Sequence, residues 1–157
     1  MAISNYVRKE LLENFTGQDY AYGSSVYIGL SSTKPNLDGT GITEPTTGGY
    51  KRALVGAYNQ SLTQVFDDIK DTDATVKNAR YIYFDRSTGG WKANEDDEDY
   101  MTLQYFVLFN GDGENAKMLA YGPIAGSDGS AQAFKVETAH TVVLVPPNAL
   151  TISVTSE

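Results

Sequence analysis

Apolar side chains near the N-terminus recur at every fourth position, the spacing that places them on one face of an α-helix. The members of this stripe are Ile3, Val7, Leu11 and Phe15. Ser4 or Asn5 is suited to cap the start of the helix, and Gly17 is suited to end it. The pattern predicts a helix over residues 3–15, whose apolar stripe packs on a sheet or on a neighbouring subunit.

The remainder of the chain alternates short apolar, aromatic and β-branched runs with polar, glycine-rich turns, a pattern typical of β-strands. The predicted strands are Ser25–Ser31, Tyr50–Ala57, Leu62–Asp67, Thr75–Phe84, Thr102–Phe109, Lys117–Ile124, Ala133–Glu137, Thr141–Val145 and Leu150–Val154. The sequence Asn110-Gly111-Asp112-Gly113 predicts a hairpin, because Asn-Gly and Asp-Gly tolerate positive φ. Pro146-Pro147-Asn148 predicts a rigid turn between the last two strands. Within Tyr81–Phe84 every side chain is large and apolar or aromatic, which predicts a segment covered on both faces.

Many short strands separated by turns favour a mainly β fold, a β-sandwich or jelly-roll-like body with one N-terminal α-helix. A length of 157 residues suits a single domain, 1–157, with the β-rich body over residues 24–155. The polar segment 86–100 interrupts this body and contains five consecutive acidic residues, Glu95–Asp99. Like charges repel one another unless they are solvated or bound to cations, so this segment is expected to be an exposed loop or insertion.

Two acidic segments are candidate cation sites. The run Glu95–Asp99 offers carboxylate oxygens to a hard cation, but adjacent side chains point to alternate sides, which favours a solvated loop. The segment Asn110–Glu114 lacks the ligand spacing and the terminal glutamate of a calcium loop, which favours a hairpin turn. No metal site is therefore predicted.

Cysteine and histidine, which often serve as catalytic residues or metal ligands, are scarce in this chain. The chain has no cysteine and one histidine, His140, which excludes Cys–His catalysis and His-rich metal sites. No Gly-x-Ser-x-Gly elbow is present, and Gly39-Thr40-Gly41 lacks the third glycine of a dinucleotide fingerprint. Two carboxylates that hydrolyse a glycan stay possible in principle, although no particular pair stands out. We expect no enzyme and no cofactor, and a structural His140.

Charge restricts the partners. Twenty acidic and twelve basic residues give a formal net charge of −8, which repels the phosphates of nucleic acids and anionic membrane surfaces. No apolar run approaches the roughly 20 residues of a membrane-spanning helix. Neither nucleic acid nor a membrane is an expected partner.

Aromatic residues are abundant, with eleven tyrosines, six phenylalanines and one tryptophan. Tyrosine is favoured in strands and at protein interfaces. A sugar-stacking surface is an alternative use of five of these side chains, Trp91, Tyr100, Tyr20, Tyr22 and Tyr27. Core and interface packing is the favoured interpretation, because aromatic side chains mainly contribute buried apolar area. A carbohydrate-binding module that recognises host surface glycans is therefore the alternative function.

The long loop before Tyr50 ends in a distinctive motif. Gly48 and Gly49 allow a tight turn into the next strand, and Tyr50 is placed to hold the loop by burying its ring. Arg52 lies two residues on, faces the same side as Tyr50, and has Glu44 and Asp38 as candidate ion-pair partners. We expect Gly49, Tyr50 and Arg52 to be structural anchors of this loop.

The order of these features resembles a family of small bacteriophage virion proteins, often labelled minor structural or tail fibre proteins. The segments that carry the resemblance are the helix around Tyr6–Phe15, Val26–Leu30, Asp38-Gly39, Gly49-Tyr50 with Arg52 and Val55, Phe106–Phe109, Leu119–Gly122 and Leu150–Val154. The resemblance implies a non-enzymatic virion protein assembled in the bacterial cytoplasm, of tail-fibre or capsid-decorating type. It also implies a homotrimer that contacts capsid, neck or tail proteins.

Overall fold

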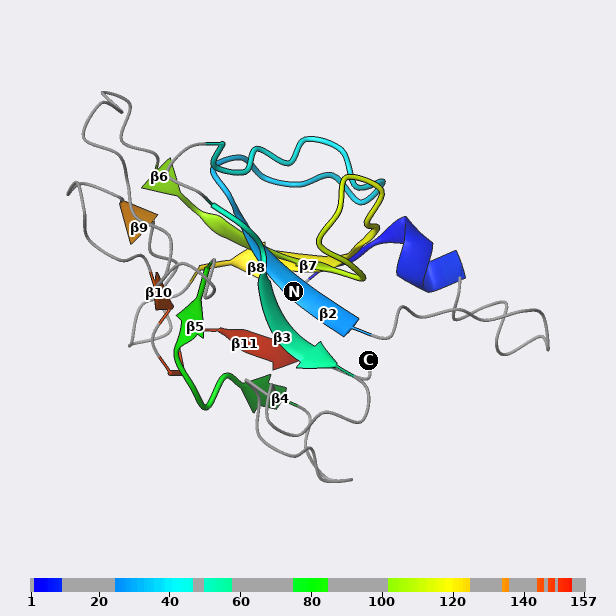
Figure 1. Cartoon of the computed structure of the whole chain (residues 1–157). Coiled ribbons are helices and arrows are strands. Elements are labelled where there is room, and N and C mark those ends of the chain that lie inside the picture. Colours follow the sequence, from blue (N-terminus) through cyan, green and yellow to red (C-terminus); the bar gives the residue numbers. More distant parts are fainter. Residues whose placement is uncertain are drawn as a thin grey trace.

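The computed structural model describes residues 2–9, 25–46, 50–57, 75–84, 102–124, 134–135, 144–145, 147–148 and 150–153. These residues form a mainly β structure with a short N-terminal helix over residues 5–9 (Figure 1). The strands are β1 (Ala2–Ile3), β2 (Ser25–Ser31), β3 (Ala53–Ala57), β4 (Thr75–Lys77), β5 (Ile82–Tyr83), β6 (Thr102–Leu103), β7 (Tyr105–Phe109), β8 (Met118–Pro123), β9 (Phe134–Lys135), β10 (Leu144–Val145) and β11 (Thr151–Ser153).

A five-stranded antiparallel sheet with the order β1-β8-β7-β2-β3 forms the centre of the fold. Side chains alternate between its two faces, as they must in a strand. On one face, Ile28 and Leu30 of β2 share a buried cluster with Ile82, Phe84 and Leu150. The strands β4, β5 and β11 lie on that side of the sheet (Figure 1).

The opposite face is covered by loops. A second buried cluster is formed there by Val107 and Phe109 of β7 with Met118 and Tyr121 of β8. Residues 32–46, which follow β2, and residues 110–117, which join β7 to β8, lie over this face (Figure 1). We call these two segments the long loop and the hairpin loop.

Three two-stranded ladders complete the described structure. The pairs are β4 with β11, β5 with β10, and β6 with β9. Asn78, which follows β4 and is fully buried, joins the first two ladders. Its backbone N–H donates to the carbonyl of Leu150, its side-chain oxygen accepts the Leu150 N–H at 2.9 Å, and its amide nitrogen donates to the carbonyl of Arg80.

Replacing Asn78 with alanine is expected to lower the free energy of unfolding by about 1–2 kcal/mol, because the buried N–H of Leu150 loses its acceptor. Urea denaturation of the purified variant measures this loss. Lys77→Ala changes an exposed neighbour and is expected to stay within about 0.5 kcal/mol of the unmodified chain. Equal stability of the two variants would contradict a stabilising role for Asn78.

The N-terminal helix begins later than the apolar spacing predicts. Ile3 lies in β1, opposite Ala120, and not in the helix. Ser4 is the cap, because its hydroxyl accepts the Val7 N–H at 3.3 Å and donates to the carbonyl of Met118 at 2.6 Å. A capping residue has extended backbone, so the residue before it is free to pair in a sheet. Val7 is buried, whereas Leu11 and Phe15 lie outside the described residues.

The mainly β class with an N-terminal helix is confirmed, and the sandwich or jelly-roll arrangement stays a prediction. The strand predicted at Ser25–Ser31 is β2 with the same bounds. The predicted strand Thr75–Phe84 is wrong as a single element, since residues 78–81, with a bend at Arg80, separate β4 from β5. Coverage of Tyr81 on both faces is also wrong, because that side chain is 50% exposed on the turn.

The predicted hairpin between Phe109 and Lys117 is confirmed, because β7 and β8 pair as antiparallel neighbours. Its predicted cause is wrong, since neither Gly111 nor Gly113 has positive φ. A loop this long does not need the mirror-image turn that two-residue hairpins require. The predicted strand Leu62–Asp67, the acidic segment 86–100 and His140 lie outside the described residues.

Candidate functional site

The long loop is held by its own short polar side chains. The buried Ser31 hydroxyl donates to the carbonyl of Thr33 at 2.7 Å and accepts the Thr43 N–H at 3.0 Å. The Thr33 hydroxyl donates to the carbonyl of Gly41 at 2.6 Å. These bonds join the two arms of the loop and satisfy the Thr33 and Gly41 carbonyls and the Thr43 N–H without a neighbouring strand.

The tip of the long loop is a turn around Asp38. The Asp38 carboxylate accepts the backbone N–H of Thr40 at 2.9 Å and the Thr40 hydroxyl at 2.7 Å. These donors stabilise the charged form and lower the pKa of Asp38 below its ordinary value. Gly39 and Gly41 have φ of 85° and 74°, a conformation that glycine adopts without a steric penalty.

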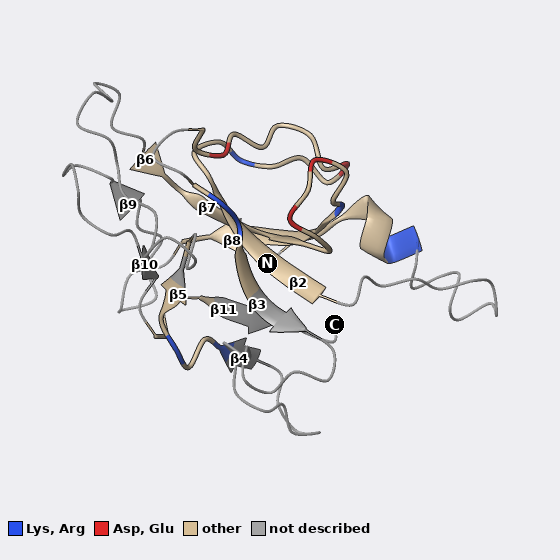
Figure 2. Cartoon of the chain, in the orientation of Figure 1, with Lys and Arg blue, Asp and Glu red and all other residues tan. Residues whose placement is uncertain are grey.

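Both exposed loops carry acidic residues. Asp38 is exposed on the long loop, and Asp112 and Glu114 are exposed on the hairpin loop. Figure 2 shows acidic and basic segments of both loops on the loop-covered side of the sheet. Lys34 of the long loop and Lys117 of the hairpin loop are also exposed. The underside of the long loop is apolar, since Leu37 and Ile42 pack against the second buried cluster.

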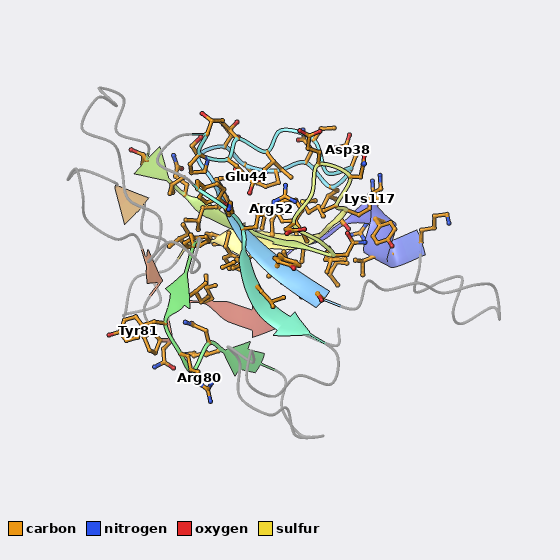
Figure 3. The ribbon with its side chains drawn as sticks, viewed as in Figure 1. Asp38, Glu44, Arg52, Arg80, Tyr81 and Lys117 are labelled. Carbon is orange, nitrogen blue, oxygen red and sulfur yellow. The ribbon has the colours of Figure 1, made fainter. Side chains whose placement is uncertain are left out.

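Three polar side chains meet at the base of the long loop, and we call them the Glu44 cluster: Glu44, Tyr50 and Arg52. Figure 3 shows Glu44 and Arg52 of this cluster. Arg52 Nη2 lies 2.7 Å from Glu44 Oε2, and Arg52 Nε donates to both carboxylate oxygens at 3.1 Å. The Tyr50 hydroxyl donates to Glu44 Oε1 at 3.0 Å. Of the two partners considered for Arg52, the structure therefore places Glu44 beside it, while Asp38 bonds to Thr40.

Tyr50 connects this cluster to the edge of the central sheet. Pairing between β2 and β3 ends at Ile28 and Ala53, and the next outward N–H of β2, that of Leu30, donates to the Tyr50 hydroxyl at 2.9 Å. The Tyr50 ring stacks on Phe84 with centroids 5.8 Å apart. The Tyr50 hydroxyl thus accepts a β2 N–H that no residue of β3 accepts in the ladder. Its ring packs against the first buried cluster, on the face of the sheet opposite the long loop.

Arg52 also contacts β7 and the hairpin loop. Its guanidinium carbon lies 3.4 Å from the centroid of the Phe109 ring, a cation–π contact. Its Nη1 donates to the carbonyls of Gly113 at 3.3 Å and Gly111 at 3.5 Å. The Arg52 side chain is only 14% exposed and the Glu44 side chain 19%, so the ion pair is shielded from much of the solvent.

A glycine makes room for the cluster. A Cβ atom at Gly29, in the middle of β2, would overlap the Glu44 carboxylate and lie 3.0 Å from Phe109 and 3.2 Å from the Tyr50 hydroxyl. The sequence did not predict that Gly29 and Phe109 contact the Glu44 cluster. The available signal was the position of Gly29 inside a strand, which often marks a close approach by another group.

The polar atoms of the cluster bond to one another and to backbone groups of β2 and the hairpin loop. No group of acidic or histidine side chains among the described residues is arranged to hold a metal ion. Burial, followed by the negative charge of Glu44, raises the pKa of Tyr50 well above 10.0.

This raised pKa predicts a loss of stability at alkaline pH. Below pH 10.0 Tyr50 is neutral in both states, so its stabilisation is fully present. As the pH rises past 10.0 the unfolded chain releases this proton while the folded chain keeps it, and folding becomes less favourable. The stability difference between the unmodified chain and Tyr50→Phe, measured by urea denaturation, should therefore shrink above pH 10.0. A constant difference would contradict the raised pKa, since the other tyrosines cancel in the comparison.

The remaining candidate residues are distributed as follows. Gly49, Trp91 and Tyr100 lie outside the described residues. Tyr27, another member of the proposed sugar-stacking set, is partly buried and packs against the second buried cluster. In the part of the chain described here, no helix has the length and apolar character to cross a membrane.

The described residues define a mainly β protein with a shielded ion pair at the base of a hydrogen-bonded surface loop. The model of the family described as Podophage GP4 fiber I protein gp80 matches residues 2–127. The chain belongs to this family of phage fibre proteins, and is therefore a structural component of the virion. No curated protein matches the chain. The matched residues include the whole Glu44 cluster and both loops, and end before β9.

Proposed function

We propose that the chain is a non-enzymatic subunit of a peripheral tail fibre, acting through contacts with other subunits and with the virion. The observation that carries this proposal is the family match over residues 2–127. The described structure is consistent with it, because the polar groups of the Glu44 cluster are engaged in holding loops. Capsid decoration is the alternative location within the particle.

Within this function we assign Gly49, Tyr50 and Arg52 to anchoring the long loop. Support comes from the bonds of Tyr50 and Arg52 to Glu44, which lies near the end of that loop. The loop then presents a shaped polar surface to solvent without depending on a partner to order it. A rigid surface binds a partner at a lower entropic cost than a flexible one.

We propose a homotrimer whose further partners are other virion proteins of the capsid, neck or tail. The proposed interface is the N-terminal stripe of Ile3, Val7, Leu11 and Phe15. Within the subunit, Val7 is buried and the Ile3 side chain is half-buried beside β8. Light scattering coupled to size-exclusion chromatography measures the oligomeric state of the purified chain, and a monomeric mass would contradict the trimer.

Immunogold labelling of intact phage particles tests the location. Antibody raised against the recombinant chain is expected to place gold at the tail. Gold on the capsid would support decoration instead, and particles without label would contradict a surface-exposed virion protein. Antibody binding to the isolated protein on a grid is the positive control.

A glycan array tests the alternative of host glycan recognition. Tyr27, the described member of the aromatic set, packs on the core instead of standing free, which favours the structural interpretation. Saturable glycan binding that Trp91→Ala abolishes would support recognition.

A further inference from the structure

We propose that Arg52 couples the long loop to the hairpin loop, so that these two exposed segments open and close as one unit. This coupling is separate from the anchoring role proposed above, because anchoring one loop does not require that the other respond to it. It concerns how the subunit presents its surface and does not depend on where the subunit sits in the particle.

The two loops are distant in sequence but share one support. Leu37 and Ile42 of the long loop and Ala116 of the hairpin loop all pack against the same buried cluster on the central sheet. Phe109, the last residue of β7 before the hairpin loop, is a member of that cluster and also carries the Arg52 guanidinium on its ring. The cation therefore lies at the base of both loops (Figure 3).

The guanidinium of Arg52 divides its donors between the two loops. Nε and Nη2 bond to the Glu44 carboxylate of the long loop, while Nη1 points to the carbonyls of Gly111 and Gly113 in the hairpin loop. A guanidinium is planar, and its donors have fixed relative directions. The carboxylate consequently orients Nη1 toward the hairpin loop. If Glu44 moves away, the plane turns and the carbonyls lose their donor.

Electrostatics favours the same coupling. Acidic segments lie on both loops (Figure 2). The exposed acidic residues are Asp38 on the long loop and Asp112 and Glu114 on the hairpin loop. Arg52 is the shielded cation between these segments, and its charge is attractive to both. Release of the guanidinium from one loop weakens its hold on the other. A partner that contacts one loop would then alter the population of open states at the second.

Hydrogen–deuterium exchange of the full chain, read by mass spectrometry, tests this proposal with Glu44→Gln. The substitution keeps the shape of residue 44 but removes the charge that orients Arg52. Backbone amides of the hairpin loop, such as the Ala116 N–H that donates to the carbonyl of Gly113, are expected to exchange at least about fivefold faster. Faster exchange in the long loop alone would overturn the coupling.

Asp38→Asn is the matched control. It also removes one carboxylate charge from the long loop, but it loosens the turn with Thr40 and leaves the Arg52 contacts in place. Hairpin amides should keep their exchange rates in this variant. An equal rise in both variants would overturn the proposal, because general loosening of the long loop would then explain the result.

Coupling free energies are reciprocal, which supplies a second variant that leaves Glu44 untouched. Asn110→Ala removes the side-chain oxygen that accepts the Lys117 N–H at 2.7 Å and so loosens the hairpin loop. Long-loop amides, such as that of Thr43, are expected to exchange faster in this variant by a comparable factor. Unchanged long-loop exchange would overturn the coupling even if Glu44→Gln failed to fold.

Discussion

Replacing Arg52 with alanine is expected to lower the free energy of unfolding by about 3 kcal/mol, the lower end of the range for breaking a buried ion pair. The lower end applies because the Arg52 and Glu44 side chains keep 14% and 19% exposure. The variant leaves a shielded carboxylate with the Tyr50 hydroxyl as its described donor, removes the cation from the Phe109 ring, and deprives two loop carbonyls of a donor. Chemical denaturation monitored by circular dichroism measures the loss.

Two variants sharpen this experiment. Lys34→Ala removes an exposed cation from the long loop and should change stability by less than about 0.5 kcal/mol. Arg52→Lys keeps the charge but cannot reproduce the fork of donors, so its stability should fall between those of the alanine variant and the unmodified chain. A loss below about 1 kcal/mol for Arg52→Ala would mean that the pair behaves as an ordinary surface salt bridge.

Replacing Gly29 with alanine is expected to cost about 2–3 kcal/mol, in the range for overfilling a packed site. The added methyl group would enter the space of the Glu44 carboxylate and press on Phe109 and the Tyr50 hydroxyl. Glu44 cannot swing aside freely, because Arg52 and Tyr50 both bind it. Relieving the overlap therefore breaks bonds of the Glu44 cluster.

The matched control is Gly113→Ala on the hairpin loop. Its added methyl group meets no atom within 4 Å and its φ is not positive, so the change should be nearly neutral. A double-mutant cycle identifies the cause at Gly29: in a Glu44→Ala background the cost of Gly29→Ala should fall below about 1 kcal/mol. An unchanged cost in that background would assign the strain to Phe109 instead of the Glu44 carboxylate.

Local sequence patterns located the central strands among the residues that the structure describes. The alternation of apolar and polar residues placed β2, and the runs before and after the hairpin loop became β7 and β8. Such patterns are reliable because a strand's periodicity is a property of consecutive residues. They were less reliable at the boundaries of elements. The helix begins after Ser4, whose hydroxyl bonds to the distant Met118. The predicted strand Thr75–Phe84 is interrupted at Asn78, whose side chain bonds to the distant Leu150.

In the Glu44 cluster too, neighbouring residues predicted some contacts, whereas others depended on residues far apart in the sequence. The spacing of Tyr50 and Arg52 put both side chains on one side of the chain, and the sequence offered two carboxylates as partners for Arg52. The choice of Glu44 depended on how the long loop folds, because Thr40 binds Asp38 at the tip. The hydrogen bonds from Arg52 to Gly111 and Gly113 could not be predicted from the sequence, because their acceptors are backbone carbonyls, which every residue has.

The sequence by itself determined the mainly β class and the position of the central strands, because these follow from composition and periodicity. It also carries the resemblance to a phage fibre family, which the family match over residues 2–127 shows. Tertiary structure alone decided which side chains meet: Arg52 with Glu44 and the hairpin loop, Tyr50 with the edge of β2, and Gly29 with the atoms that exclude a side chain there. The physical reason is that these contacts depend on strand register and on the path of the long loop across the sheet. Both are set by burial of residues that lie far apart in the chain.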